Sequence, residues 1–115
     1  MPREISGAEF LHKYQGITDV VTRIVPEKIY AVFHPTAHPI YENQRVHRFA
    51  ELLSKPFSEN VFEELGNLMY GSHESYTACG LGTGGTDLLI ELVKKSKSLH
   101  GAKITGGGSG GTVAV

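Results

Sequence analysis

Glycine is concentrated in the C-terminal third of this chain, and that concentration limits what the region can fold into. Ten of the 14 glycines among the 115 residues lie within residues 80–111. Glycine loses more backbone entropy on folding than any other residue, so such a cluster indicates a backbone conformation that side chains would not allow. The densest part, residues 106–111, holds five glycines and one serine, and it is where we expect a function.

Two short apolar stretches, residues 102–105 and 112–115, flank this glycine segment and are predicted to be strands. A glycine-rich loop lets backbone N–H groups point into one concave space, which suits a phosphate or the close approach of another segment. A flexible hairpin connection explains the same composition equally well, so both interpretations stay open. The segment lacks the Gly-Lys-Ser/Thr ending of a Walker loop. Because an apolar strand ends the chain, we expect the natural domain to continue past Val115.

Apolar residues at helical spacing predict three main helices after one short helix. The short helix begins with a capping-box pattern at Ser6 and stops at Gly16. The main helices are predicted over about residues 40–54, from Ser58 to about Tyr76, and around residues 87–97. We expect the first two of these to pack as an antiparallel pair.

Two further segments, residues 20–25 and 29–33, are rich in β-branched and aromatic residues and predict extended structure. Residues 34–39 are predicted to be a loop, because Pro35 and Pro39 push each preceding residue away from the helical region. About four strands and three main helices indicate an α+β fold without determining the strand order. A length of 115 residues fits one domain, and we treat residues 1–115 as one.

Composition excludes several classes of protein. Apolar residues make up 40% and charged residues 20% of the chain, as in ordinary soluble globular proteins. The 11 basic and 12 acidic residues are interspersed and give a net charge of −1, so neither nucleic acid nor an anionic membrane is an expected partner. A single cysteine, Cys79, cannot form an internal disulfide, and with no apolar N-terminal run the expected setting is the reducing cytoplasm.

A second cluster of polar residues lies before the glycine-rich third of the chain. His73 and Glu74 have side chains that can do acid–base work, and Ser72 or Ser75 can meet a ligand hydroxyl. The interpretation that we favour is simpler, with these residues on the exposed side of a helix end. The order of the residues fits no known nucleophile triad.

Histidines and the cysteine offer only weak alternatives. His34, His38 and His47 suggest a metal site, but prolines break the spacing of the first two and no cysteine or further histidine completes a ligand set. Nothing near Cys79 in sequence would lower the pKa of its thiol and make it a nucleophile. We therefore assign no metal ligand and no catalytic residue.

The glycine segment and its first strand, with the sequence GAKITGGGSGG over residues 101–111, resemble the third, C-terminal motif of the GHMP kinases. This family is named for galactokinase, homoserine kinase, mevalonate kinase and phosphomevalonate kinase. Residues 38–46 and 68–87 are similar to the C-terminal region of the plant-type L-arabinokinases, a galactokinase-like group. The resemblance covers about residues 10–115.

This resemblance implies an α+β C-terminal domain of an ATP-dependent sugar 1-kinase, which transfers the γ-phosphoryl group of ATP to the anomeric hydroxyl of a monosaccharide such as L-arabinose or galactose. The family's phosphate loop and catalytic aspartate belong to an N-terminal half that has no counterpart here. ATP and Mg²⁺ would be bound mainly by that half, so we expect the isolated chain to be inactive. The motif's role near the substrate cleft carries over to Gly106, Gly107, Gly108, Ser109, Gly110 and Gly111.

Two hypotheses follow from the sequence. The chain is either the C-terminal part of a sugar kinase or a non-catalytic binding module that uses the glycine segment for a phosphorylated ligand or a protein partner. The first predicts apolar surface where the other half docks, and the second predicts a self-sufficient monomer or a closed homodimer. Because the chain stops within an apolar strand, we favour the first hypothesis.

Overall fold

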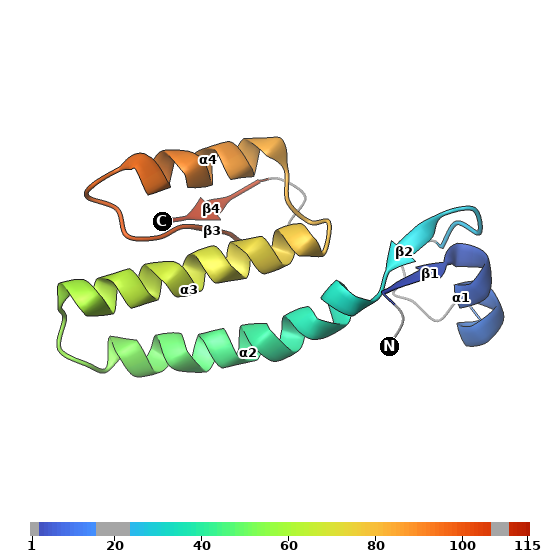
Figure 1. The fold of residues 1–115 in the computed structure, drawn as a ribbon, viewed down its shortest axis with the longest axis horizontal. Helices are drawn as coiled ribbons and strands as arrows, with labels where there is room; N and C mark the ends of the chain where they lie inside the picture. Colours follow the sequence, from blue (N-terminus) through green and yellow to red (C-terminus); the bar gives the residue numbers. More distant parts are fainter. Residues whose placement is uncertain (1–2, 16–23, 107–110) are drawn as a thin grey trace. The chain divides into compact units, whose positions relative to one another are not determined.

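The computed structural model describes residues 3–15, 24–106 and 111–115 (Figure 1). The chain divides into two compact units, Met1–Ala37 and His38–Val115. Helices predominate, and the described strands form two small antiparallel sheets. This content agrees with the predicted α+β class. None of the helices in the described ranges combines the length and apolar character that crossing a bilayer requires.

The first unit contains a two-stranded sheet and a short helix. Strand β1 (Glu4–Ser6) pairs antiparallel with β2 (Ile29–Ala31), and helix α1 (Gly7–Tyr14) follows β1 directly. The side chain of Ser6 accepts a hydrogen bond from the N–H of Glu9 at 3.1 Å, so the predicted cap is confirmed. The sequence does not predict β1, because three residues are too few to display alternation. The segment predicted over residues 20–25 lies mostly outside the described residues, and its last two residues form no strand.

Helix α2 (Phe33–Leu53) begins earlier than the sequence predicts, so the loop predicted over residues 34–39 is wrong. Pro35 is the third residue of the helix, where its missing N–H has no partner to lose. The hydroxyl of Thr36 donates to the carbonyl of Val32 at 2.7 Å and supports the first turn. Pro39 lies inside the helix and removes one hydrogen bond. Two prolines four residues apart are therefore compatible with a helix that starts just before them.

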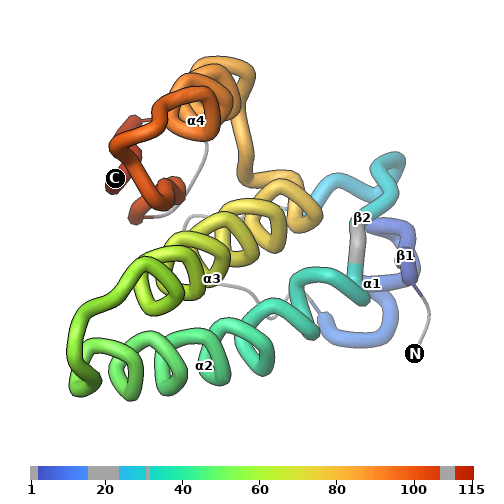
Figure 2. Tube along the Cα trace, turned by 60° about the vertical axis from the view of Figure 1, so that its left-hand side comes forward, coloured from blue at the N-terminus to red at the C-terminus, as the bar shows by residue number. Residues whose placement is uncertain are grey.

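From His38 on, α2 belongs to the second unit, where it and α3 (Glu59–Ala78) run antiparallel and side by side, as predicted (Figures 1 and 2). The side chain of Ser58 caps α3 by accepting from the N–H of Val61 at 3.3 Å. Phe57, just before the cap, stacks on Phe62 with ring centroids 5.4 Å apart, which fixes the entry of the chain into the helix. Three polar pairs join the helices: His38 with Ser75, Glu42 with Ser72, and Arg48 with Glu64.

The two predicted strands, β3 (Lys103–Ile104) and β4 (Val113–Ala114), pair as a hairpin, which lies between α3 and α4 (Gly84–Lys95) (Figure 1). The core combines Ile90 and Val93 of α4 with Ala102, and Tyr70 and Val113 pack against it. The leucines that mark α4 in the sequence are not in this core: they are exposed on the helix, with Leu88 at 62%. The predicted helix is confirmed, but the face that it buries is not the face that carries its leucines.

Two glycines allow α3 and the segment before β3 to touch through their backbones. A Cβ added at Gly66 would lie 1.8 Å from the carbonyl oxygen of His100, and one added at Gly101 would lie 2.4 Å from the Cα of Gly66. Both distances are far below van der Waals contact, so a side chain at either position requires the backbone to move. This backbone contact determines the point along α3 beside which the chain leads into β3.

We predict that Gly66→Ala lowers the free energy of unfolding by more than about 2 kcal/mol, because the new methyl group meets backbone that cannot rotate away. The control is Gly85→Ala, since Gly85 lies in the first turn of α4 with open space around it. That control should be neutral or slightly stabilising, because alanine is the better helix former. Urea denaturation compares the two variants, and equal effects would contradict the role given to Gly66.

Candidate functional site

The described ends of the glycine segment adopt conformations that favour glycine. Gly106 has φ of 69° and Gly111 has φ of 99°. Between β3 and the first of these glycines, the N–H of Thr105 donates to the carbonyl of Thr112 at 3.0 Å and extends the hairpin. The other predicted site residues, Gly107, Gly108, Ser109 and Gly110, lie outside the described residues. The candidate site is therefore defined here by the base of the glycine segment and the side chains around it.

His73 binds the backbone of β3 from helix α3. Its Nδ1 accepts a hydrogen bond from the N–H of Ile104 at 3.2 Å, and its Nε2 lies 2.8 Å from Oδ1 of Asp87 in α4. An acceptor at Nδ1 leaves the ring proton on Nε2, which donates it to the Asp87 carboxylate. The residue is only 5% exposed. His73 thus joins two helices and a strand.

The predicted exposed position of this polar cluster is wrong for two of its four residues. Ser72 is 2% exposed and His73 is buried, whereas Glu74 is exposed and Ser75 is half-buried. Both buried side chains have hydrogen-bond partners, as buried polar groups require. The structure therefore does not place His73 and Glu74 together in a shared acid–base site.

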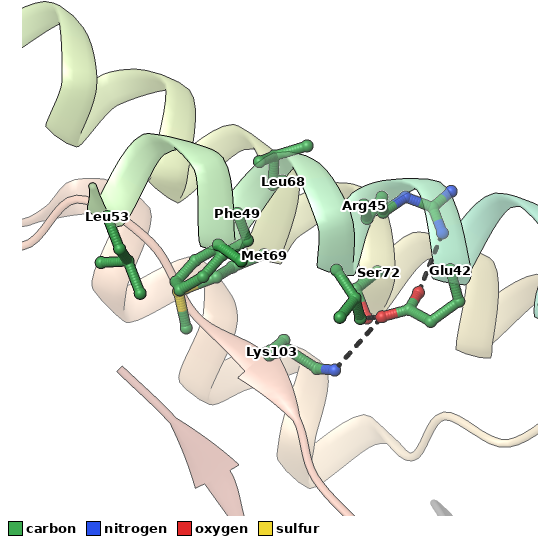
Figure 3. Close-up of a pocket in the computed structure, with 10 residues that line it drawn as sticks. Glu42, Arg45, Phe49, Leu53, Leu68, Met69, Ser72 and Lys103 are labelled. Carbon is green, nitrogen blue, oxygen red and sulfur yellow. Dashed lines mark hydrogen bonds and ion pairs between the residues drawn. The ribbon is translucent and has the colours of Figure 1, made fainter. Parts of the chain in front are cut away.

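Glu42 is the centre of a cluster of charged and polar side chains between α2, α3 and β3 (Figure 3). Its carboxylate accepts from the Ser72 hydroxyl at 2.7 Å and from Arg45 at 2.9 Å, and Nζ of Lys103 lies 3.6 Å away. Partial burial tends to raise the pKa of Glu42, but the Ser72 hydrogen bond, Lys103 and Arg45 together hold it below its ordinary value. The carboxylate therefore stays ionised at neutral pH and fixes both cations.

Tyr76 lies between this cluster and the glycine segment. Its hydroxyl donates to the carbonyl oxygen of Gly106 at 3.2 Å. The His38 ring packs against the Tyr76 ring in a T-shaped arrangement with centroids 4.7 Å apart, and Nζ of Lys103 lies 5.7 Å from the centre of the Tyr76 ring. His38 is held in turn by a 2.6 Å hydrogen bond between its Nδ1 and the Ser75 hydroxyl.

A groove of about 330 Å³ extends from the Glu42 cluster along the two long helices (Figure 3). Its volume is at the lower end of the range typical of small-molecule sites. The walls are apolar except at the Glu42 end, so the apolar residues that predict α2 line an open groove instead of filling a core. The apolar residues are Val46, Phe49, Ala50, Leu53, Leu68 and Met69.

The remaining candidates from the sequence acquire no functional arrangement in the described part of the chain. No group of three or more His, Cys, Asp or Glu side chains converges there as metal ligands do. Burial raises the pKa of the Cys79 thiol, which keeps it from ionising at neutral pH. This direction agrees with the prediction that nothing activates Cys79.

Sequence reasoning missed Glu42, Tyr76 and Lys103, although each carried a weak signal. Glu42 and Arg45 are three residues apart in a helix, a spacing at which opposite charges pair. Lys103 alternates with the buried Ile104 in a strand, so its side chain points to the other face. Tyr76 falls on the same side of α3 as His73, one turn later. None of these signals indicates which distant residue is the partner.

The charge of Glu42 should make the free energy of unfolding depend on pH in the acidic range. Because its folded pKa is below the unfolded value of 4.5, its contribution is present above that pH and is lost as the pH falls through the folded pKa. We predict that Glu42→Gln, which keeps the shape but not the charge, lowers the free energy of unfolding by about 1 kcal/mol near neutral pH. The difference should shrink below about pH 4.5 in urea titrations. A difference that is constant with pH would contradict the role of the carboxylate.

Searches for similar proteins find sugar kinases. L-arabinokinase of Arabidopsis thaliana is 47% identical over 124 aligned residues, which cover 100% of this chain and 12% of the plant protein. Galactokinase of Thermotoga petrophila is 34% identical over 97% of this chain and 35% of its own length. Galactokinase of Staphylococcus saprophyticus is 34% identical over 94% of this chain and 25% of its own length. No family model and no solved structure matches.

The chain spans only part of each of these relatives, from 12% of the plant protein to 35% of the Thermotoga petrophila galactokinase. The similarity nevertheless extends over the whole of this chain in the plant protein. It includes the glycine segment, helix α3 and the first turns of α2, which carry the residues described above. The predicted resemblance is confirmed: this chain is related in sequence to a segment of L-arabinokinase and, more distantly, to the galactokinases.

Proposed function

We propose that this chain is the C-terminal part of a GHMP-type sugar 1-kinase, which transfers the γ-phosphoryl group of ATP to the anomeric hydroxyl of a monosaccharide such as L-arabinose or galactose. The observation that carries the proposal is the 47% identity to a protein named L-arabinokinase, which extends over every residue of this chain. The glycine segment between two paired strands supports it. The proposed site residues are Gly106, Gly107, Gly108, Ser109, Gly110 and Gly111.

The proposed contribution of these residues is positional. Phosphoryl transfer depends on holding the reacting groups in line and on neutralising the charge that develops on the transferred group. Backbone N–H groups of a glycine-rich segment can supply such neutralisation without a side chain in the way. The positive φ of Gly106 and Gly111 supports a tight turn of the backbone at both ends of the segment.

Mg²⁺ does not fit the donor groups of the described residues. No three acidic, histidine or cysteine side chains converge there, and the Glu42 carboxylate is already engaged by Ser72, Arg45 and Lys103. We therefore assign Mg²⁺ no ligand among the residues that the structure describes. ATP and Mg²⁺ would be bound mainly by kinase residues outside these 115.

The kinase proposal is tested by ATP consumption with L-arabinose, galactose and glucuronate. The assay compares this chain with the same chain extended by the sequence that flanks it in its genome. We expect turnover only in the extended protein, and the sugar that supports it names the substrate. No turnover in either protein, with no phosphate loop in the flanking sequence, would reject the kinase and leave the non-catalytic binding module.

Gly111 provides a test of the glycine segment itself. Its φ of 99° is outside the regions that an alanine adopts without strain, although a Cβ there would meet no neighbour. We predict that Gly111→Ala lowers kcat of the extended kinase by about tenfold or more, because it redirects the backbone of the segment. Gly85→Ala, in open space on α4, is the matched control and should keep wild-type kcat. Equal kcat values in both variants would contradict a role for the segment in turnover.

A further inference from the structure

Two side chains of helix α3 bind the hairpin backbone on the side away from β4, His73 at Ile104 of β3 and Tyr76 at Gly106 just after it. Successive residues of a strand direct their backbone groups to opposite edges. The N–H of Thr105 accordingly points to β4 and donates to the carbonyl of Thr112. The N–H of Ile104 points the other way and meets Nδ1 of His73 at 3.2 Å. Beyond the strand, the carbonyl of Gly106 meets the hydroxyl of Tyr76, also at 3.2 Å.

The two α3 residues differ in how they are held. His73 is buried and fixed by Asp87, so its bond to Ile104 belongs to the core of the unit. Tyr76 is half-buried, and its ring is oriented by T-shaped packing with the His38 ring and by the ammonium group of Lys103. Neither of these two contacts involves the glycine segment. The hydroxyl of Tyr76 is therefore placed independently of the carbonyl that it binds.

Gly106 is the point at which the hairpin passes from paired strand to glycine segment. It has positive φ, and no described atom beyond its own and the two adjacent residues lies within 4 Å of where its Cβ would be. Side-chain packing at this residue therefore cannot determine the direction of the chain. The hydrogen bond from Tyr76 instead holds this residue through its carbonyl oxygen.

We propose that Tyr76 is a positioning residue for phosphoryl transfer: its hydroxyl fixes the carbonyl of Gly106, the first residue of the glycine segment. The proposal rests on the proposed kinase function. It assigns to His38 and Lys103 the task of orienting the tyrosine ring. Because the bond is at the surface, its loss should affect the position of Gly106 much more than the stability of the fold.

The test is Tyr76→Phe in the full polypeptide that carries these residues, since this change removes one oxygen and keeps the ring. Tyr70→Phe is the matched control, because Tyr70 lies six residues earlier in α3 and packs against the core cluster with Lys94 over its ring. Hydrogen exchange is followed at the amides of residues 105–112. We expect exchange about fivefold faster in Tyr76→Phe and unchanged in Tyr70→Phe, with equal melting temperatures.

Steady-state kinetics then separate positioning from a purely structural role. We expect Tyr76→Phe to lower kcat about fivefold while KM for the sugar and the melting temperature stay at the wild-type values. If the amides of Tyr76→Phe exchange at the wild-type rate, the positioning role of the hydrogen bond is overturned. If they exchange faster but kcat is unchanged, the role of the hydrogen bond in turnover is overturned. A wild-type protein that transfers no phosphoryl group would reject the kinase function, whereas the exchange data would still report on the contact between Tyr76 and Gly106.

Discussion

The hydrogen bonds of one buried histidine organise the second unit of this chain. His73 accepts from the backbone of Ile104 and donates to Asp87, so a single ring connects α3, α4 and β3. Without it, the N–H of Ile104, a residue with no exposed surface, would lose its partner, and an unsatisfied buried group costs about 1–3 kcal/mol. The close contact of Gly66 with Gly101 and His100 fixes the same strand at its other end. Together these contacts hold β3 along α3 and place the glycine segment beyond it.

The polar side chains around Glu42 continue this arrangement toward the two long helices. The carboxylate is held by a hydroxyl and two cations from three different elements, which is why its pKa is lowered despite partial burial. Lys103 serves two neighbours, since its ammonium group lies near both Glu42 and the ring of Tyr76. The base of the glycine segment is thus linked to α2 through side chains that all have partners, and not through a continuous apolar core. The apolar residues of α2 and α3 remain available along the groove.

The similarity to sugar kinases and the contacts at the ends of the glycine segment both support the proposed kinase function. Phosphoryl transfer requires little covalent participation by the protein and depends on accurate placement of charged groups. A segment that contributes only backbone must be directed by what holds its ends. In this chain the ends are held by hairpin pairing at Thr105 and by α3 at Ile104 and Gly106. These contacts hold the described ends of the segment for which we propose a role in phosphoryl transfer.

The sequence alone determined the local structure, because caps, glycines and apolar spacing act within a few residues of one another. The cap at Ser58, helix α3 and the two strands β3 and β4 were predictable for that reason. The sequence could not show that Pro35 lies inside the first turn of a helix, since the same residue is compatible with a loop. Only the tertiary structure decided that His73 is buried and that Tyr76 binds the glycine segment. Their partners lie about 30 residues away in sequence, and periodicity carries no information about contacts over that distance.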